Sequence, residues 1–99
     1  MYLIAYDIEN DRLRTKTADQ LLAAGCIRLQ KSVFAGELDG ALFKKVESWL
    51  KKNVNTAKYP DDKVLILDVG PETMKAMQWI GTPSDEWQLL TNPPDVLFL

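Results

Sequence analysis

The sequence has no histidine and one cysteine, Cys26, among its 99 residues. Without histidine the chain lacks the residues for a Ser-His-Asp triad, a Cys-His nucleophile, haem ligation and most zinc sites. A lone cysteine cannot form a disulfide within the chain. Any catalysis by this protein must therefore use carboxylates, hydroxyls and basic side chains.

Long apolar runs are missing too. No stretch comes near the roughly 18 consecutive apolar residues of a membrane span, and no basic segment followed by an apolar run opens the chain. We therefore expect a cytoplasmic protein with no membrane partner. The 99 residues leave room for one domain, and a hydrophobic content of 46% suffices for its core without disulfide or metal.

Charge is distributed unevenly, although the net charge is only −2. Residues 1–58 contain ten Lys and Arg against seven Asp and Glu, whereas residues 59–99 contain two against seven. The first part can meet a polyanion in spite of the acidic total, because charges beyond a Debye length are screened. Ordinary solvated surface charge explains the same pattern.

Hydrophobic periodicity predicts the secondary structure. Apolar residues alternate in 2–8 and recur at helical spacing in 11–24, where Gly25 ends the helix. Residues 26–38 return to a period of two, and we expect a bend at Lys31-Ser32 to break this run. The remaining predicted elements are a helix capped by Asp39 and ending at about residue 53, a strand at 63–69, a helical turn at 71–77, an edge strand at 78–80 and a connector at 81–85.

This order predicts an α+β fold, the ferredoxin-like β-α-β-β-α-β sandwich, over residues 1–81, followed by a tail at 82–99 that ends in an extra C-terminal strand. The two helices of that fold cover one face of the sheet. The strand at 63–69, however, is apolar on both sides, which suits burial on both faces. A second copy or the tail must cover the other face, and we expect a two-fold homodimer.

Asp7 ends the first predicted strand. An aspartate in this place commonly caps or solvates the loop that follows. As a ligand of Mg²⁺, one carboxylate per chain is too few unless two copies of Asp7 meet across a dimer axis. A metal held there would polarise a phosphate and lower the pKa of a bound water without help from histidine.

Three cations, Arg12, Arg14 and Lys16, lie in the opening turns of the first predicted helix, where the helix dipole disfavours positive charge. Contact with a phosphate explains them, and so does pairing with neighbouring acidic residues. On the second strand, Arg28 lies on the same side as Phe34 in a largely polar stripe.

A set of spaced motifs lies in residues 1–50: Tyr6-Asp7-Ile8, Asp11, Leu13-Arg14, Gly25, Arg28, Gln30 and the stretch SVFAGEL at 32–38. Together they resemble the CRISPR-associated protein 2 family, small ferredoxin-like homodimers of prokaryotic adaptive immunity. Beyond residue 60 the resemblance is only architectural.

The resemblance implies two activities. Members of the family bridge two dimers of the integrase, CRISPR-associated protein 1, and hold DNA for spacer insertion, and several are described as Mg²⁺-dependent nucleases acting on RNA or DNA. It puts the metal on Asp7 and implies a catalytic part for Asp7 and four further side chains, Tyr6, Arg14, Arg28 and Phe34. From this resemblance together with the cations at the start of the first helix, we predict nucleic-acid contacts by the basic side chains Arg12, Arg14, Lys16 and Arg28. Residues 95–99 have the composition of a strand that adds to the integrase, and pairing within the protein's own dimer is the alternative.

We therefore predict a nucleic-acid-binding subunit of the CRISPR spacer-acquisition complex, with a Mg²⁺-dependent endonuclease centre at the dimer interface. Two alternatives stay open. One is a stand-alone metal-dependent ribonuclease toxin of the same fold. The other is a regulatory dimer that binds a small metabolite, which predicts an apolar pocket between subunits and no salt-dependent affinity for DNA.

Overall fold

The computed structural model describes residues 1–91 of the chain. Its elements in chain order are β1 (Tyr2–Asp7), α1 (Asp11–Ala23), β2 (Ile27–Gln30), β3 (Val33–Gly36), α2 (Gly40–Asn53), β4 (Lys63–Asp68), α3 (Pro71–Lys75) and α4 (Asp85–Thr91). The first six match the predicted elements to within one or two residues, and the break at Lys31-Ser32 is the turn between β2 and β3. The predicted α+β class and element order are therefore confirmed.

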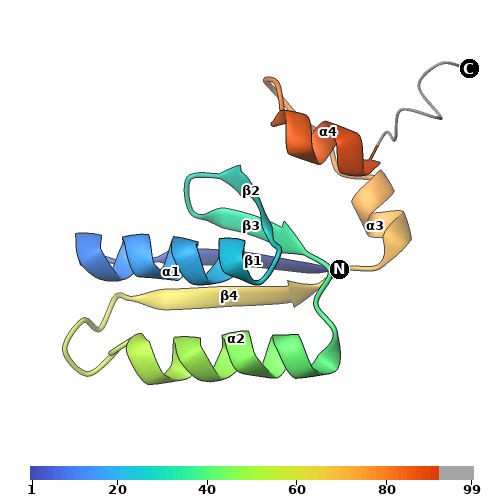
Figure 1. Cartoon of the computed structure of the whole chain (residues 1–99). Helices are drawn as coiled ribbons and strands as arrows, with labels where there is room; N and C mark the ends of the chain where they lie inside the picture. The colour runs from blue at the N-terminus through green and yellow to red at the C-terminus, as the bar shows by residue number, and fades with distance from the viewer. Residues whose placement is uncertain (92–99) are drawn as a thin grey trace, which may run out of the picture.

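The four strands form one sheet in the order β2-β3-β1-β4, and every neighbouring pair is antiparallel. This is the strand order of the ferredoxin-like fold, in which the two halves of the chain interleave. Figure 1 shows α1 and α2 on the same side of the sheet. As a result, β1 lies in the middle of the sheet and β4 at one edge.

Local signals in the sequence account for the helix boundaries. The Asn10 side chain accepts a hydrogen bond from the Leu13 N–H at 2.9 Å, and the Asp39 side chain accepts one from the Leu42 N–H at 2.8 Å. Each therefore satisfies one of the free N–H groups at a helix start. Gly25 follows α1 with a φ of +92°, a left-handed conformation that glycine adopts without steric cost. These signals fix where α1 begins and ends and where α2 begins.

The core fills the space between the sheet and the two helices. Its largest fully buried side chains are Phe34 from β3, Ile4 from β1, and Leu21 and Thr17 from α1. The rings of Tyr6 and Phe34 stack with their centroids 6.0 Å apart. One face of β1 and β3 is thus committed to packing under the helices.

The opposite face of the sheet is not covered by α1 or α2. On β4, the side chains of Leu65 and Leu67 are 65% and 51% exposed. Their cross-strand neighbours on β1, Ala5 and Leu3, are half-buried. Within residues 1–91 the second apolar face of β4 therefore has no covering layer, as expected for a fold whose helices cover one face, and its burial by a second copy or by the tail stays a prediction. We call this surface the open face.

The segment after β4 differs from the prediction. Residues 78–80 form no strand, and Ile80 is fully exposed, because no neighbouring strand within residues 1–91 pairs with this stretch. α4 follows at residues 85–91, beside β2 in Figure 1, with Trp87 buried. The Ser84 hydroxyl caps it by accepting a hydrogen bond from the Trp87 N–H at 3.2 Å. The predicted strand at the C-terminus lies outside the described residues, and the domain boundary at residue 81 stays a prediction.

No helix within residues 1–91 is both long enough and apolar enough to cross a bilayer.

Candidate functional site

Asp7 is the last residue of β1, and its side chain is exposed. Because side chains alternate along a strand, Asp7 lies on the open face together with Leu3 and Ala5. Its Cα pairs with that of Lys63, the first residue of β4, so the two side chains leave the sheet on the same side. A carboxylate therefore lies at the border of an exposed apolar surface, with a lysine as its cross-strand neighbour.

The loop at residues 8–10, which follows Asp7, is held by Arg14 from α1. The Arg14 Nη1 donates hydrogen bonds to the carbonyl oxygens of Ile8 at 3.1 Å and Glu9 at 3.3 Å, and the guanidinium also forms an ion pair with Asp11. Of the two alternatives from the sequence, pairing with an acidic neighbour is thus present in the structure. Arg14 therefore fixes the backbone of the two residues that follow Asp7 in the chain.

The same loop is also held by Asp62, the residue just before β4. One carboxylate oxygen of Asp62 accepts a hydrogen bond from the Glu9 N–H at 2.9 Å, and the residue is only 4% exposed. No motif in the sequence indicated this role, because Pro60-Asp61-Asp62 has the composition of an ordinary polar turn.

Tyr6 and Phe34 lie on the other face of the sheet from Asp7, inside the core. The Tyr6 hydroxyl is buried and has no hydrogen-bond partner within residues 1–91. Arg28 is exposed at the margin of this layer, and its guanidinium carbon lies 5.0 Å from the centroid of the Phe34 ring. A cation near an aromatic face at this distance is attracted to it. The structure therefore brings Tyr6, Phe34 and Arg28 together, but it separates Tyr6 and Phe34 from Asp7 by the thickness of the sheet.

Arg12 and Lys16 are exposed on α1, and neither forms an ion pair with a residue in the described part of the chain. Their charges are therefore available to an anion that approaches the start of α1. Arg14 differs from these two cations because its guanidinium is already engaged with the loop.

A metal site within one chain would need more ligands than Asp7. Residues 1–91 contain no cluster of three or more His, Cys, Asp or Glu side chains suited to hold an ion. Mg²⁺ binds through one or two carboxylates together with water and phosphate oxygens, so an exposed, hard oxygen donor such as Asp7 fits half of such a site. One chain therefore offers a single carboxylate, and a second Asp7, water or phosphate oxygens would have to supply the other ligands of Mg²⁺.

A family model described as CRISPR associated protein Cas2 matches residues 1–77. The chain belongs to this family. It is 33% identical over 79 residues to the CRISPR-associated endoribonuclease Cas2 of Aeropyrum pernix, a match that covers 80% of this chain and 83% of that protein. A second relative, from Thermoproteus tenax, is a CRISPR-associated endonuclease Cas1/endonuclease Cas2 fusion; it is 41% identical over 58 residues, which cover 58% of this chain and 22% of the fusion.

Among solved structures, Cas2 of Streptococcus pyogenes superimposes with a TM-score of 0.69 at 18% sequence identity, covering 81% of this chain and 98% of that one. At this identity the likeness concerns the fold alone. The family match includes every residue of the Asp7 surroundings and ends between α3 and α4.

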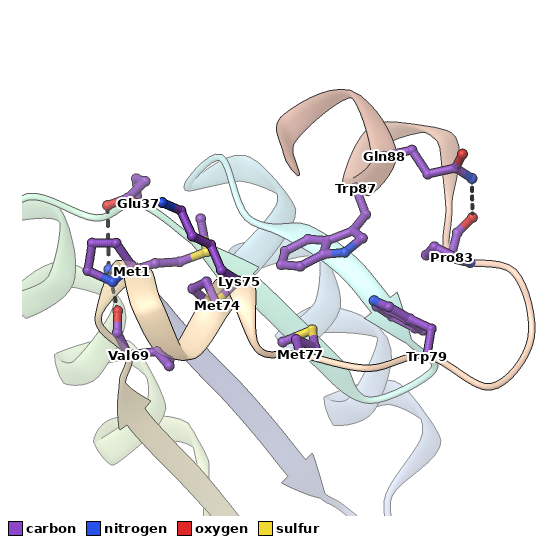
Figure 2. Close-up of a pocket in the computed structure, with 11 residues that line it drawn as sticks. Met1, Glu37, Val69, Met74, Lys75, Met77, Trp79, Pro83, Trp87 and Gln88 are labelled. Carbon is purple, nitrogen blue, oxygen red and sulfur yellow. Dashed lines mark hydrogen bonds and ion pairs between the residues drawn. The ribbon is translucent and has the colours of Figure 1, made fainter. Parts of the chain in front are cut away.

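An apolar cavity of about 620 Å³ lies at the other end of the sheet, beside the start of β1 and the end of β4 (Figure 2). Its lining residues are Met1, Glu37, Val69, Pro71, Met74, Lys75, Met77, Trp79, Pro83, Trp87 and Gln88. The rings of Trp79 and Trp87 lie 6.2 Å apart at an angle of 58°. Four of the lining residues lie beyond residue 77, so this cavity is built in part outside the segment that matches the Cas2 family. It forms within one chain, whereas the metabolite-binding alternative predicted a pocket between subunits.

Proposed function

We propose that this chain is a nucleic-acid-binding Cas2 subunit of the CRISPR spacer-acquisition complex, with a Mg²⁺-dependent endonuclease centre formed by Asp7 from two copies. The observation that carries the proposal is the place of Asp7 at the border of the open face. Two-fold stacking of that face about an axis that passes close to Asp7 would bring the two Asp7 carboxylates together. The endoribonuclease names of the curated relatives support a nuclease activity.

The open face supports the homodimer. Leu65 and Leu67 are exposed next to Leu3 and Ala5, which makes a continuous apolar surface on two adjacent strands. Burying such a surface against water is favourable, by about 25 cal/mol for each Å². A two-fold axis lets one chain cover the same surface on another.

In this proposal the two Asp7 carboxylates hold the metal, and Arg14 keeps the loop behind each of them in place. When bound, Mg²⁺ supplies charge that polarises the phosphate and lowers the pKa of a water. The exposed cations Arg12 and Lys16 at the start of α1 bind phosphates of the nucleic acid, whereas Arg28, over Phe34 on the other face of the sheet from Asp7, binds a phosphate only away from the reacting one. This binding weakens as salt rises, because each phosphate contact releases condensed counterions.

The fusion of a Cas1 endonuclease with a Cas2 endonuclease in Thermoproteus tenax supports Cas1 as the protein partner. The predicted docking segment, residues 95–99, lies outside the described residues. A stand-alone ribonuclease is the second candidate, and it is favoured by the endoribonuclease names of the relatives. Co-purification with Cas1 separates the two, because only the acquisition subunit needs that partner.

The central experiment compares the wild type with Asp7→Asn on RNA and on duplex DNA, in Mg²⁺ and in chelator. We expect Asp7→Asn in Mg²⁺ to cleave no faster than the wild type in chelator, with an unchanged thermal midpoint, since Asp7 is exposed. Asp61→Asn is the matched control, because it removes an exposed carboxylate near the start of β4. Equal cleavage by the wild type and Asp7→Asn would contradict the nuclease proposal.

The homodimer is tested separately by sedimentation. We expect Leu67→Glu to shift the chain to a monomer, because it places a charge in the middle of the open face. Leu22→Glu is the control, since Leu22 is a comparably exposed leucine on α1, 45% exposed against 51% for Leu67. A wild type that sediments as a monomer at all concentrations would overturn the shared Asp7 site.

A further inference from the structure

The loop after Asp7 is held by side chains from two different elements. Arg14 of α1 donates to the carbonyl oxygens of Ile8 and Glu9, and Asp62 of the β4 approach accepts from the Glu9 N–H at 2.9 Å. Three backbone groups of two successive residues are thus bonded to side chains. Loops of this length usually leave such groups to water.

Asp62 is an unusual choice for this task. It is the only charged residue in the buried class among the described residues, and its second carboxylate oxygen is buried without a hydrogen-bond partner there. A buried carboxylate that is only partly paired destabilises a fold. A residue with this cost is more easily understood as serving the site than as serving the stability of the loop.

The register of the sheet places Asp62 next to a residue that pairs with Asp7. Lys63, the next residue, pairs with Asp7 in the β1–β4 ladder. Asp62 holds the N–H of Glu9, two residues further along. The same short segment of chain therefore fixes the backbone at Asp7 and again at Glu9, while Arg14 holds the carbonyl groups between α1 and the strand end.

We infer that Asp62 is a positioning residue for Asp7: it fixes the direction in which the chain leaves β1 and so the direction of the Asp7 carboxylate. This inference rests on the proposed function. Two carboxylates that share one ion must both be placed closely, and a displacement of about 1 Å can cost about 100-fold in rate.

The test compares Asp62→Ala and Asp62→Asn with the wild type at a temperature well below every thermal midpoint. Asparagine keeps an oxygen that can accept from Glu9, whereas alanine does not. We expect Asp62→Ala to lower kcat by about 100-fold with KM for the nucleic acid within about twofold. We expect Asp62→Asn to keep most of kcat.

Hydrogen exchange of the Glu9 amide gives a readout that does not depend on activity. We expect Asp62→Ala to speed this exchange and Asp62→Asn to leave it slow. Thr17→Ala is the matched control for loss of a buried polar side chain, since Thr17 is buried in α1 and its hydroxyl donates to the Leu13 carbonyl at 2.8 Å. It should lower stability while leaving kcat and Glu9 exchange unchanged.

Three outcomes would overturn the inference: an unchanged kcat in Asp62→Ala, an equal loss in Asp62→Asn and Asp62→Ala, or an unchanged Glu9 exchange in Asp62→Ala. If instead the proposed nuclease function is wrong, Asp7→Asn leaves cleavage intact. Hydrogen exchange of the Glu9 amide then decides alone whether Asp62 fixes the loop.

Discussion

The two ends of the sheet are built by different means. At the Asp7 end, charged side chains bind backbone groups, and the residue that matters is exposed. At the cavity end, methionine and tryptophan side chains enclose an apolar space, and the tightly buried residue is Trp87. The Asp7 end is thus organised by polar contacts to the backbone and the cavity end by apolar packing, while the main core lies between the sheet and the two helices α1 and α2.

The family match follows this division only in part. It spans residues 1–77 and so contains the whole Asp7 end, whereas Trp79, Trp87 and the rest of α4 lie beyond it. If the two ends are independent, changes at the cavity end should leave the hydrogen bonds of the loop after Asp7 as they are.

The largest effect at the cavity end is expected from Trp87→Ala. Truncating a buried tryptophan costs about 3–5 kcal/mol, and α4 has few other contacts to the sheet, so we expect α4 to detach. Limited proteolysis should then cut within residues 76–91, while amides of β1 and β3 keep their protection from exchange. Leu89→Ala is the control on the same helix, because Leu89 is exposed. Loss of protection across the whole sheet would show that the two ends are not independent.

A smaller effect is expected from Gly36→Ala, at the end of β3. A Cβ added there would lie 2.6 Å from the Cys26 Sγ and 3.2 Å from the Cys26 Cα. Overpacking of this kind costs about 1–3 kcal/mol, measurable as a lower urea midpoint. Gly40→Ala should be tolerated, since nothing lies within 4 Å of its added Cβ. Combining Gly36→Ala with Cys26→Ala should recover part of the loss; no recovery would mean that the backbone contact dominates.

The smallest effect concerns pH. Burial raises the pKa of the Cys26 thiol above its ordinary value of 9.0. The unfolded chain therefore releases this proton at a lower pH than the folded chain does. The free energy of unfolding is therefore unaffected by this group below pH 9.0. As pH rises from 9.0 through the pKa of the folded chain, the free energy of unfolding decreases, because only the unfolded chain releases the Cys26 proton. Above pH 9.0 the urea midpoint of the wild type should fall relative to that of Cys26→Ala, which has no thiol to titrate. A constant difference would contradict this assignment.

The sequence predicted the sandwich because its signals there are local and periodic. Strand alternation, the helix stripes, the Asp39 cap and the glycine after α1 all lie within a few residues of the feature that they specify. For the same reason Asp7 could be found as a strand-end carboxylate from the sequence alone. The sequence also indicated a second apolar face on β4 that the two helices leave uncovered, but it could not show what covers that face.

The sequence predictions that failed after β4, and the role of Asp62, have different causes. Residues 78–80 have strand composition, yet a strand needs a neighbour to bond with, and composition does not supply one. α4 was missed although Ser84 followed by two acidic residues is a recognisable helix start. Asp62 could not be distinguished from Asp61, because only the folded chain decides which of the two reaches Glu9.

The hydrogen bond between Asp62 and Glu9 joins residues 53 positions apart in the chain. Such a contact forms only after the intervening strands and helices have been brought together, because closing a long segment is entropically costly. A partly folded chain that contains β1, α1 and the β2–β3 hairpin therefore carries Asp7 without this anchor. The loop after Asp7 therefore takes its final conformation only when β4 pairs with β1. In a nascent or locally unfolded chain the Asp7 carboxylate would be poorly oriented.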